Sequence, residues 1–156
     1  MKTYLKLSTA IALTAISGLL WAQTVDVQGA WARATVPGQK ATGAYMKLTS
    51  ATGAKLVSAS SPVAGAVEVH EMKMEGDVMQ MRALKDGLDL PMARAIELKP
   101  GGVHIMLMDL KRPLLKDTTV PMTLIFKDRK GSEFKTELKV PVSSTPPAQM
   151  AISIGR

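Results

Sequence analysis

The stretch VPMTLIFKDRKGSEFKTELKVPV, residues 120–142, decides the fold class of this chain. Apolar and polar residues alternate on both sides of DRKGS at 128–132, and a period of two is the pattern of a β-strand with one buried face. A polar segment that contains glycine between two such runs is typical of a hairpin turn. The sequence therefore predicts two antiparallel strands. One face of the first carries Val120, Met122, Leu124 and Phe126, one face of the second carries Phe134, Thr136, Leu138, Val140 and Val142, and Lys127, Lys135, Glu137 and Lys139 face water.

Shorter segments with the same alternation lie upstream, for example at Ala44, Met46 and Leu48, and they are separated by Gly, Pro and Asp residues. No stretch of useful length shows the 3.6-residue period of an amphipathic helix. Several short strands at this spacing favour an all-β fold, a two-sheet β-sandwich with Greek-key connections, over an α/β fold. A length of 156 residues suits one domain with its own core.

The two ends of the chain differ in composition from the region between them. Residues 1–22 combine two lysines with an apolar run and end in the small residue Ala22, which is the pattern of a secretory signal peptide. The apolar run is short for a membrane span of ~20 residues, so we expect cleavage before Gln23 and no stable membrane insertion, with retention as an anchor as the alternative. Residues 23–142 form the predicted β-sandwich domain. Residues 143–156 contain a Pro-Pro pair and no alternation, so they are predicted to be a flexible tail.

Composition excludes several classes of function. The chain contains no cysteine, which removes thiolate chemistry and excludes a blue-copper electron-transfer centre, because such a centre needs a cysteine ligand. The net charge is +7 and falls to +5 without the two lysines of residues 1–22. The basic residues are spread over strands and turns, and aromatic residues are few, so a solvated surface is favoured over a nucleic-acid interface.

Both histidines of the chain lie in methionine-rich strand patterns. His70 lies in VEVHEMKMEGDVMQMRAL, residues 67–84, and His104 lies in GGVHIMLMDL, residues 101–110. Thioether sulfur and neutral imidazole together favour a soft cation such as Cu(I), whereas carboxylates favour calcium or magnesium and cysteine sets favour zinc. Methionines in these two segments are Met72, Met74, Met79, Met81, Met106 and Met108.

The first of these segments predicts a hairpin that brings a histidine and a methionine together. A two-residue loop at Glu75-Gly76 places His70 opposite Met81 on one face, where the Cβ atoms of opposed residues are only ~5 Å apart. The same register places Met72 opposite Met79. A loop longer by one residue would move the methionines to the other face.

The second segment predicts a strand with two different faces. His104, Met106 and Met108 share one face, whereas the other face consists of Val103, Ile105 and Leu107. The branched apolar set is the natural core face. We therefore expect the His/Met face to be turned outward or toward a cleft.

A competing structural interpretation is a sandwich in which methionines fill gaps in the core and both histidines are incidental. It is stronger for the hairpin, whose His/Met face is the less polar one, than for the His104 strand. Taken together, His-x10-Met and His-x-Met in one small cysteine-free domain favour a metal site.

Trp31 can shield such a site, although a role as a core anchor is favoured. An enzyme is not expected, since no Ser/His/Asp set and no phosphate-binding glycine loop are evident.

The same residues resemble the PCuAC family of periplasmic copper chaperones, whose pattern is a His, ten residues, a Met and then a His-x-Met motif. Ten residues separate His70 from Met81. Residues 82–103 separate Met81 from His104, which is one residue more than the usual family spacing. The resemblance extends to AWARATVPGQKATGAYMKL and to LKPGGVHIMLMDLKRPL, so it covers most of the predicted domain.

This resemblance implies a cupredoxin-like β-sandwich and a periplasmic location. It also implies a role in delivering copper to the CuA centre of cytochrome c oxidase, directly or with Sco-type proteins. Some relatives bind Cu(II) through a Met/His-rich tail, but residues 143–156 contain no histidine, so a second site for Cu(II) stays open as an alternative and no residues are assigned to it. The Cu(I) ligands that the resemblance implies are His70, Met81, His104 and Met106, and Met72, Met74, Met79 and Met108 become candidates for a surrounding or relay role.

Two other functions remain as alternatives. A copper storage or resistance protein of the periplasm is the nearer one. An exported β-sandwich adhesion or assembly module without a metal is the alternative from another class.

Overall fold

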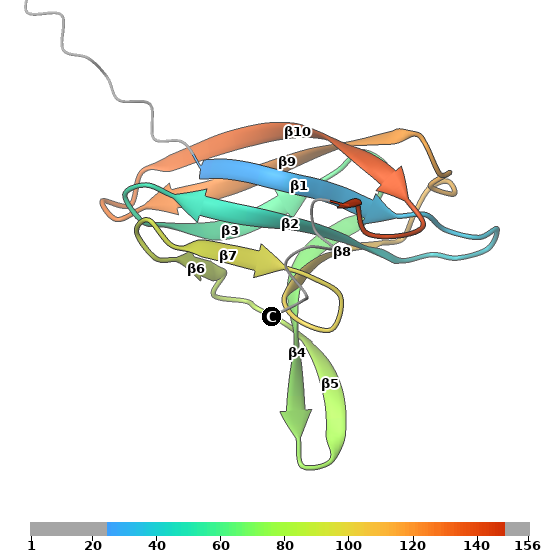
Figure 1. Ribbon diagram of the computed structural model, residues 1–156, viewed down its shortest axis with the longest axis horizontal. Helices are drawn as coiled ribbons and strands as arrows, with labels where there is room; N and C mark the ends of the chain where they lie inside the picture. The colour runs from blue at the N-terminus through green and yellow to red at the C-terminus, as the bar shows by residue number, and fades with distance from the viewer. Residues whose placement is uncertain (1–24, 149–156) are drawn as a thin grey trace, which may run out of the picture.

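The computed structural model describes residues 25–148, and within this range the chain forms ten β-strands (Figure 1). Hydrogen bonding connects nine of them in the order β5-β4-β8-β2-β1-β10-β9-β3-β6, and β7 pairs with β2. The strands are β1 (Val25–Arg33), β2 (Thr42–Ser50), β3 (Ala54–Ser60), β4 (Ala66–Glu75), β5 (Val78–Ala83), β6 (Leu88–Leu90), β7 (Ala95–Leu98), β8 (His104–Met108), β9 (Thr119–Asp128) and β10 (Glu133–Ser143).

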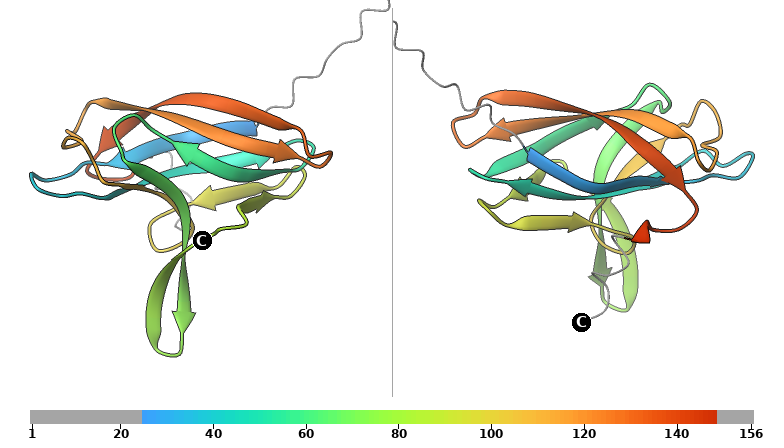
Figure 2. Two further views of the ribbon diagram at one scale, coloured as in Figure 1. Left: turned by 180° about the vertical axis from the view of Figure 1, so that it is seen from behind. Right: turned by 45° about the horizontal axis from the view of Figure 1, so that its top comes forward.

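Two layers face each other across the core, as the sequence predicted. Strands β4, β8, β2 and β1 belong to one layer and strands β10, β9 and β3 to the other, and a short parallel contact between Ala32 of β1 and Val142 of β10 joins them. Spatial neighbours such as β4 and β8, or β3 and β9, are distant in the sequence, so the connections cross between the layers (Figures 1 and 2). The all-β sandwich prediction is confirmed.

The predicted C-terminal hairpin is formed by β9 and β10. Phe126 pairs with Phe134, and their rings stack with centroids 5.4 Å apart. The turn is held by Asp128, whose carboxylate accepts hydrogen bonds of 2.8 Å from the backbone N–H groups of Lys130 and Ser132. The alternation in this stretch therefore predicted the buried and exposed faces correctly. Val120, Met122, Leu124 and Phe126 are buried, and Lys127, Lys135, Glu137 and Lys139 are exposed.

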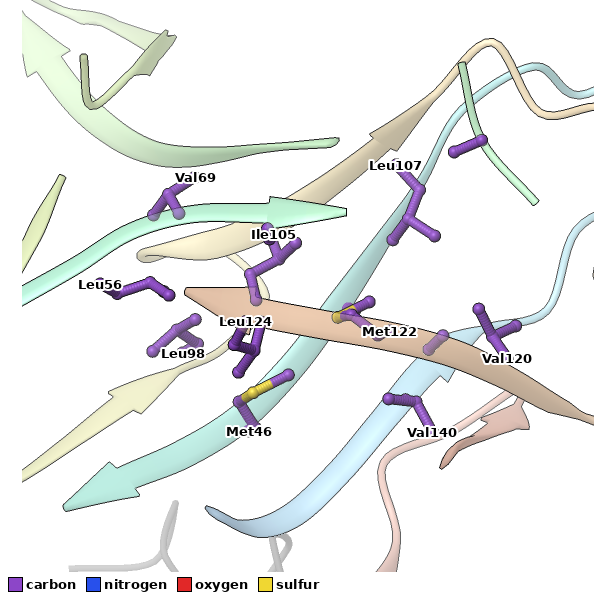
Figure 3. Close-up of a cluster of buried hydrophobic side chains, with 14 of the residues drawn as sticks. Met46, Leu56, Val69, Leu98, Ile105, Leu107, Val120, Met122, Leu124 and Val140 are labelled. Atoms are coloured by element: carbon purple, nitrogen blue, oxygen red, sulfur yellow. The ribbon is translucent and has the colours of Figure 1, made fainter. Parts of the chain in front are cut away.

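The core lies between the two layers and is made of apolar side chains from both of them (Figure 3). Ile105 and Leu107 of β8 are fully buried in it, as expected for the branched face of that strand. Met46 and Met122 are also buried there. For these two methionines, the interpretation as flexible gap fillers is correct.

Strands β4 and β5 form a hairpin whose outer part projects away from the sandwich (Figures 1 and 2). The predicted register of this hairpin is wrong. Glu75 pairs with Val78, so the loop is Gly76-Asp77, and His70 pairs with Ala83 instead of Met81. Gly76 has φ +61, the conformation that a type II′ turn requires at its first loop residue, and glycine adopts it without steric cost.

The register differs from the predicted one by two residues, and this difference preserves the faces. Side chains alternate with a period of two, so a shift of two residues keeps every side chain on its predicted side of the strand. Met81 now lies opposite Met72, and Met79 lies opposite Met74, on the side that carries His70.

The predicted signal peptide at residues 1–22 and the outer part of the predicted tail, residues 149–156, lie outside the described range. Among residues 25–148, no helix is long and apolar enough to cross a membrane.

Ile105→Ala should lower the free energy of unfolding by about 2–5 kcal/mol, because it removes buried methylene groups from a close-packed core. Val78→Ala, on the exposed hairpin, should change it by less than about 0.5 kcal/mol. Urea denaturation of the two variants beside the unchanged protein measures both values. Equal effects would contradict the placement of the core.

Candidate metal centre

The pairing of β4 with β8 brings the two histidines together. His70 lies directly opposite His104 in this antiparallel pair, and Glu68 lies opposite Met106. The two imidazole rings meet edge to face, with their centroids 6.0 Å apart. Because opposed residues of an antiparallel pair point to the same side, Met106 and both histidines share one face of the sheet. Met81 of β5 is on that face as well.

A cavity of about 340 Å³ opens on this face. Three of the four predicted ligand residues, Met81, His104 and Met106, line it, and so does Met72. His70 is not part of this lining, although its ring contacts that of His104, which is. The remaining wall consists of Arg33, Gln39, Ala41, Thr42, Gly43, Tyr45, Pro100 and Gly101.

His104 is held in one tautomer by its own loop. Only 5% of the residue is exposed, and its Nδ1 lies 3.0 Å from the carbonyl oxygen of Gly102. A carbonyl oxygen only accepts hydrogen bonds, so Nδ1 carries the proton and donates it. In the neutral ring Nε2 then keeps its lone pair, and this is the arrangement found in metal-binding histidines whose other nitrogen is bonded to the protein.

His70 shows the complementary arrangement. Its Nε2 lies 2.8 Å from Oε2 of Glu68, and since a carboxylate oxygen accepts, the Nε2–H donates. Its Nδ1 is buried and has no hydrogen-bond partner. A buried polar atom without a partner is costly, and a metal ion bound to its lone pair would remove this cost.

Aromatic residues support the histidines from the neighbouring strands. The ring of Tyr45 lies 6.4 Å from the ring of His104 and 4.7 Å from that of Trp31. Gly43 has no side chain at the place that the Tyr45 hydroxyl occupies, and a Cβ atom there would collide with it. Trp31 is fully buried, in agreement with the anchor role, but its partner is Tyr45 on the site's side and not the main core.

The hairpin methionines do not belong to the core. Met74 is 54% exposed, and Met79 and Met81 are each 48% exposed. The interpretation that the His/Met face of the hairpin is simply core is therefore wrong for these three residues. Packing in the core therefore does not explain why methionines occupy these three positions.

Chemically, this group of residues offers soft and neutral donors. Within residues 25–148 no group of three or more His, Asp or Glu side chains could hold a metal ion, so a carboxylate-rich site for a hard cation is absent from the described part of the chain. Two imidazoles with thioethers beside them suit a soft ion.

Comparison with known proteins places the chain in a family. The family described as "Putative lipoprotein LpqE-like" matches residues 25–142. The chain belongs to this family. A relative of similar sequence, the "Putative lipoprotein Lxx21020" of Leifsonia xyli subsp. xyli, is 34% identical over 118 residues, which is 76% of this chain and 71% of that protein.

Solved structures of PCuAC domains have the same fold. The copper-bound PCuAC domain of PmoF2 matches with a TM-score of 0.61 and 21% identity, over 80% of this chain and 97% of that one. DR1885 of Deinococcus radiodurans matches in its apo form with a TM-score of 0.56 and 32% identity, over 92% of this chain and 97% of that one. Its CuI form matches with a TM-score of 0.59 and 33% identity, over 81% of this chain and 83% of that one. The cupredoxin-like β-sandwich prediction is confirmed.

Sequence reasoning missed two residues of this site, Glu68 and Tyr45, and it gave Met72 only a surrounding or relay role. Alternation already placed Glu68 and Met72 on the face of His70, and it placed Tyr45 on the face opposite to Ala44 and Met46. What was missing was the order of the strands. Local patterns contain no information on which strand lies beside β4 or β8.

The two histidines should carry their protons on different nitrogens. At a pH where both rings are neutral, long-range ¹H–¹⁵N correlation spectra should show His70 protonated at Nε2 and His104 at Nδ1. Glu68→Ala removes the acceptor and should give His70 a mixture of tautomers. Glu71→Ala, on the opposite face of β4, is the control and should leave both patterns unchanged. A His70 pattern unaffected by Glu68→Ala would contradict the assigned role of Glu68.

Proposed function

We propose that this protein binds one Cu(I) ion outside the cytoplasm through His70, Met81, His104 and Met106 and hands it on to another copper protein. The observation that carries the proposal is the buried Nδ1 of His70, which has no hydrogen-bond partner and lies beside the second histidine of the chain. Thioether side chains share the same face. Such a group has no evident purpose without a soft ligand.

The donor set favours Cu(I) over Cu(II). Two neutral imidazoles and two thioethers leave a net charge of +1 on the complex, and thioether sulfur is a soft donor that prefers Cu(I). Cu(II) prefers nitrogen and oxygen in a tetragonal arrangement. Met72 lies opposite Met81 and lines the same cavity, so it is an additional donor within the group. Residues 143–156 contain one methionine and no histidine, so the proposal includes no Cu(II) site.

The comparisons support this proposal. DR1885, at 33% identity, has a structure described as its CuI form, and the PmoF2 domain has one described as copper-bound. The described relative from Leifsonia is named a lipoprotein, which is consistent with the exported, periplasmic location that the N-terminal pattern predicts.

We further propose delivery to the CuA centre of cytochrome c oxidase, directly or with Sco-type proteins, as the purpose of binding. A carrier must release its ion as well as hold it. Met81 is half exposed although it belongs to the proposed ligand set, so an incoming protein can replace this thioether while the buried His104 still holds the ion. Stepwise replacement of neutral ligands needs no change of oxidation state.

Anaerobic titration with Cu(I) against a chromophoric chelator should show about one tightly bound ion per chain. His70→Ala and Met106→Ala should each weaken binding by more than about 100-fold, because losing even an outer partner of a metal ligand costs roughly 10- to 100-fold. Met92→Ala is the matched control, since Met92 is 60% exposed and pairs with Ser50 at the far end of β2. Unchanged binding in both site variants would exclude the assigned ligands.

Deletion of the gene distinguishes a copper delivery function from a copper storage function. If the protein delivers copper, the deletion strain should contain cytochrome c oxidase with little copper in its CuA centre, and added copper should partly restore it. Restoration by the wild-type gene but not by His70→Ala would connect the effect to the site. Normal oxidase loading together with reduced copper tolerance would instead favour a storage or resistance role.

A further inference from the structure

Four methionines form a regular series on the projecting β4–β5 hairpin. Met72 lies opposite Met81, and Met74 lies opposite Met79, all on the face that carries His70. We call Met72 with Met81 the inner pair and Met74 with Met79 the outer pair. Consecutive residues on one face of a strand are about 7 Å apart, and opposed Cβ atoms are about 5 Å apart. Thioether sulfurs therefore follow one another from the histidines toward the tip of the hairpin.

Packing does not account for the outer pair. The outer part of the hairpin extends beyond the sandwich (Figures 1 and 2), and both residues of the pair are about half exposed, at 54% and 48%. The opposite face of the hairpin is polar and includes an ion pair between Glu71 and Arg82, with 2.6 Å between Oε1 and Nε. Among residues 25–148, the core includes no side chain from the outer part of the hairpin, so exposed apolar side chains there gain little from burial.

Exposure rises from the two histidines to the methionines of the hairpin. The side chain of His70 is 12% exposed and His104 is 5% exposed. On β4 Met72 is half-buried and Met74 is 54% exposed, whereas on β5 Met81 and Met79 are both 48% exposed. Another protein can therefore touch the outer pair without any opening of the cavity. The charged residues nearest the tip, Lys73, Glu75 and Asp77, are exposed and together carry a small negative charge, which weakly favours a cation.

We propose that Met74 and Met79 form a transient Cu(I) site that serves as the port through which the ion is taken up and released. This proposal rests on the Cu(I) site proposed above. The ion passes from the outer pair to the inner pair and then to the histidines. In each step one Cu–S bond breaks while the next Cu–S or Cu–N bond forms, copper remains Cu(I), and no electron or proton is transferred. The partner at the port is a copper protein with soft sulfur donors, because such donors compete well with thioethers for Cu(I).

Rates of transfer test the port. The double variant Met74→Leu/Met79→Leu keeps apolar side chains of similar volume and removes only the sulfur atoms. In anaerobic stopped-flow experiments with bicinchoninate as the copper acceptor and donor, both release and uptake of Cu(I) should slow by about tenfold or more. Their ratio, the dissociation constant, should stay within about twofold, because a port lowers the barrier and is empty in the final state. Met92→Leu, an exposed methionine far from the hairpin, is the control and should leave both rates unchanged.

The possible failures are distinguishable. If the unchanged protein binds no Cu(I), the proposed function itself is wrong. If it binds one ion and the double variant transfers that ion as fast as the unchanged protein, only the port is wrong. If the double variant bound Cu(I) more weakly by the same factor by which its uptake slowed, the port would also be wrong. Such a result would make the outer pair part of the final site.

Nuclear magnetic resonance of protein labelled with ¹³C at the methionine methyl groups locates the port directly. Ag(I) is a soft cation that does not cycle between oxidation states, so it is the probe. The first equivalent should shift the signals of Met81 and Met106, and further Ag(I) should shift Met74 and Met79 together. The Met92 signal should stay in place. Signals of Met74 and Met79 that move no more than that of Met92 would contradict the port.

Discussion

The antiparallel pairing of β4 with β8 is the constraint on which the rest of the site depends. Backbone hydrogen bonds set this register, and they place His70 opposite His104 and Glu68 opposite Met106. The hydrogen bonds to Glu68 and Gly102 then fix which ring nitrogen of each histidine keeps its lone pair. Tyr45 packs against His104 from the next strand, and Trp31 packs against Tyr45. A slip of one residue in this pair would send one histidine into the core face.

The eleven methionines have at least two different roles, and burial separates them. Met46 and Met122 are buried between the layers, where a flexible apolar side chain fills space. Met74, Met79 and Met81 are about half exposed on a hairpin that leaves the sandwich, where space filling is no explanation. The Cu(I) site and port that we propose account for the second group. Methionine content alone would not have distinguished the groups, because both occur in alternating strand patterns.

The β4–β5 hairpin shows why a wrong register can still give the right face. The loop was expected at Glu75-Gly76 and lies at Gly76-Asp77, so every cross-strand partner changed. The reason is the backbone: Gly76 takes the first loop position with a positive φ. Because the change amounts to two residues, His70, Met72 and Met81 remain on one face. The corrected register brings Met72 opposite Met81, and both line the same cavity.

The sequence by itself determined the fold class, the β9–β10 hairpin and the faces of the strands that carry the two histidines. These features depend on alternation and turn chemistry, which act between residues close together in the chain. Only the tertiary structure decided that β8 lies beside β4, that Tyr45 packs against His104, and that the outer methionines are exposed. Strand neighbours far apart in the sequence are chosen by how the whole core packs, and a local pattern contains no record of that choice.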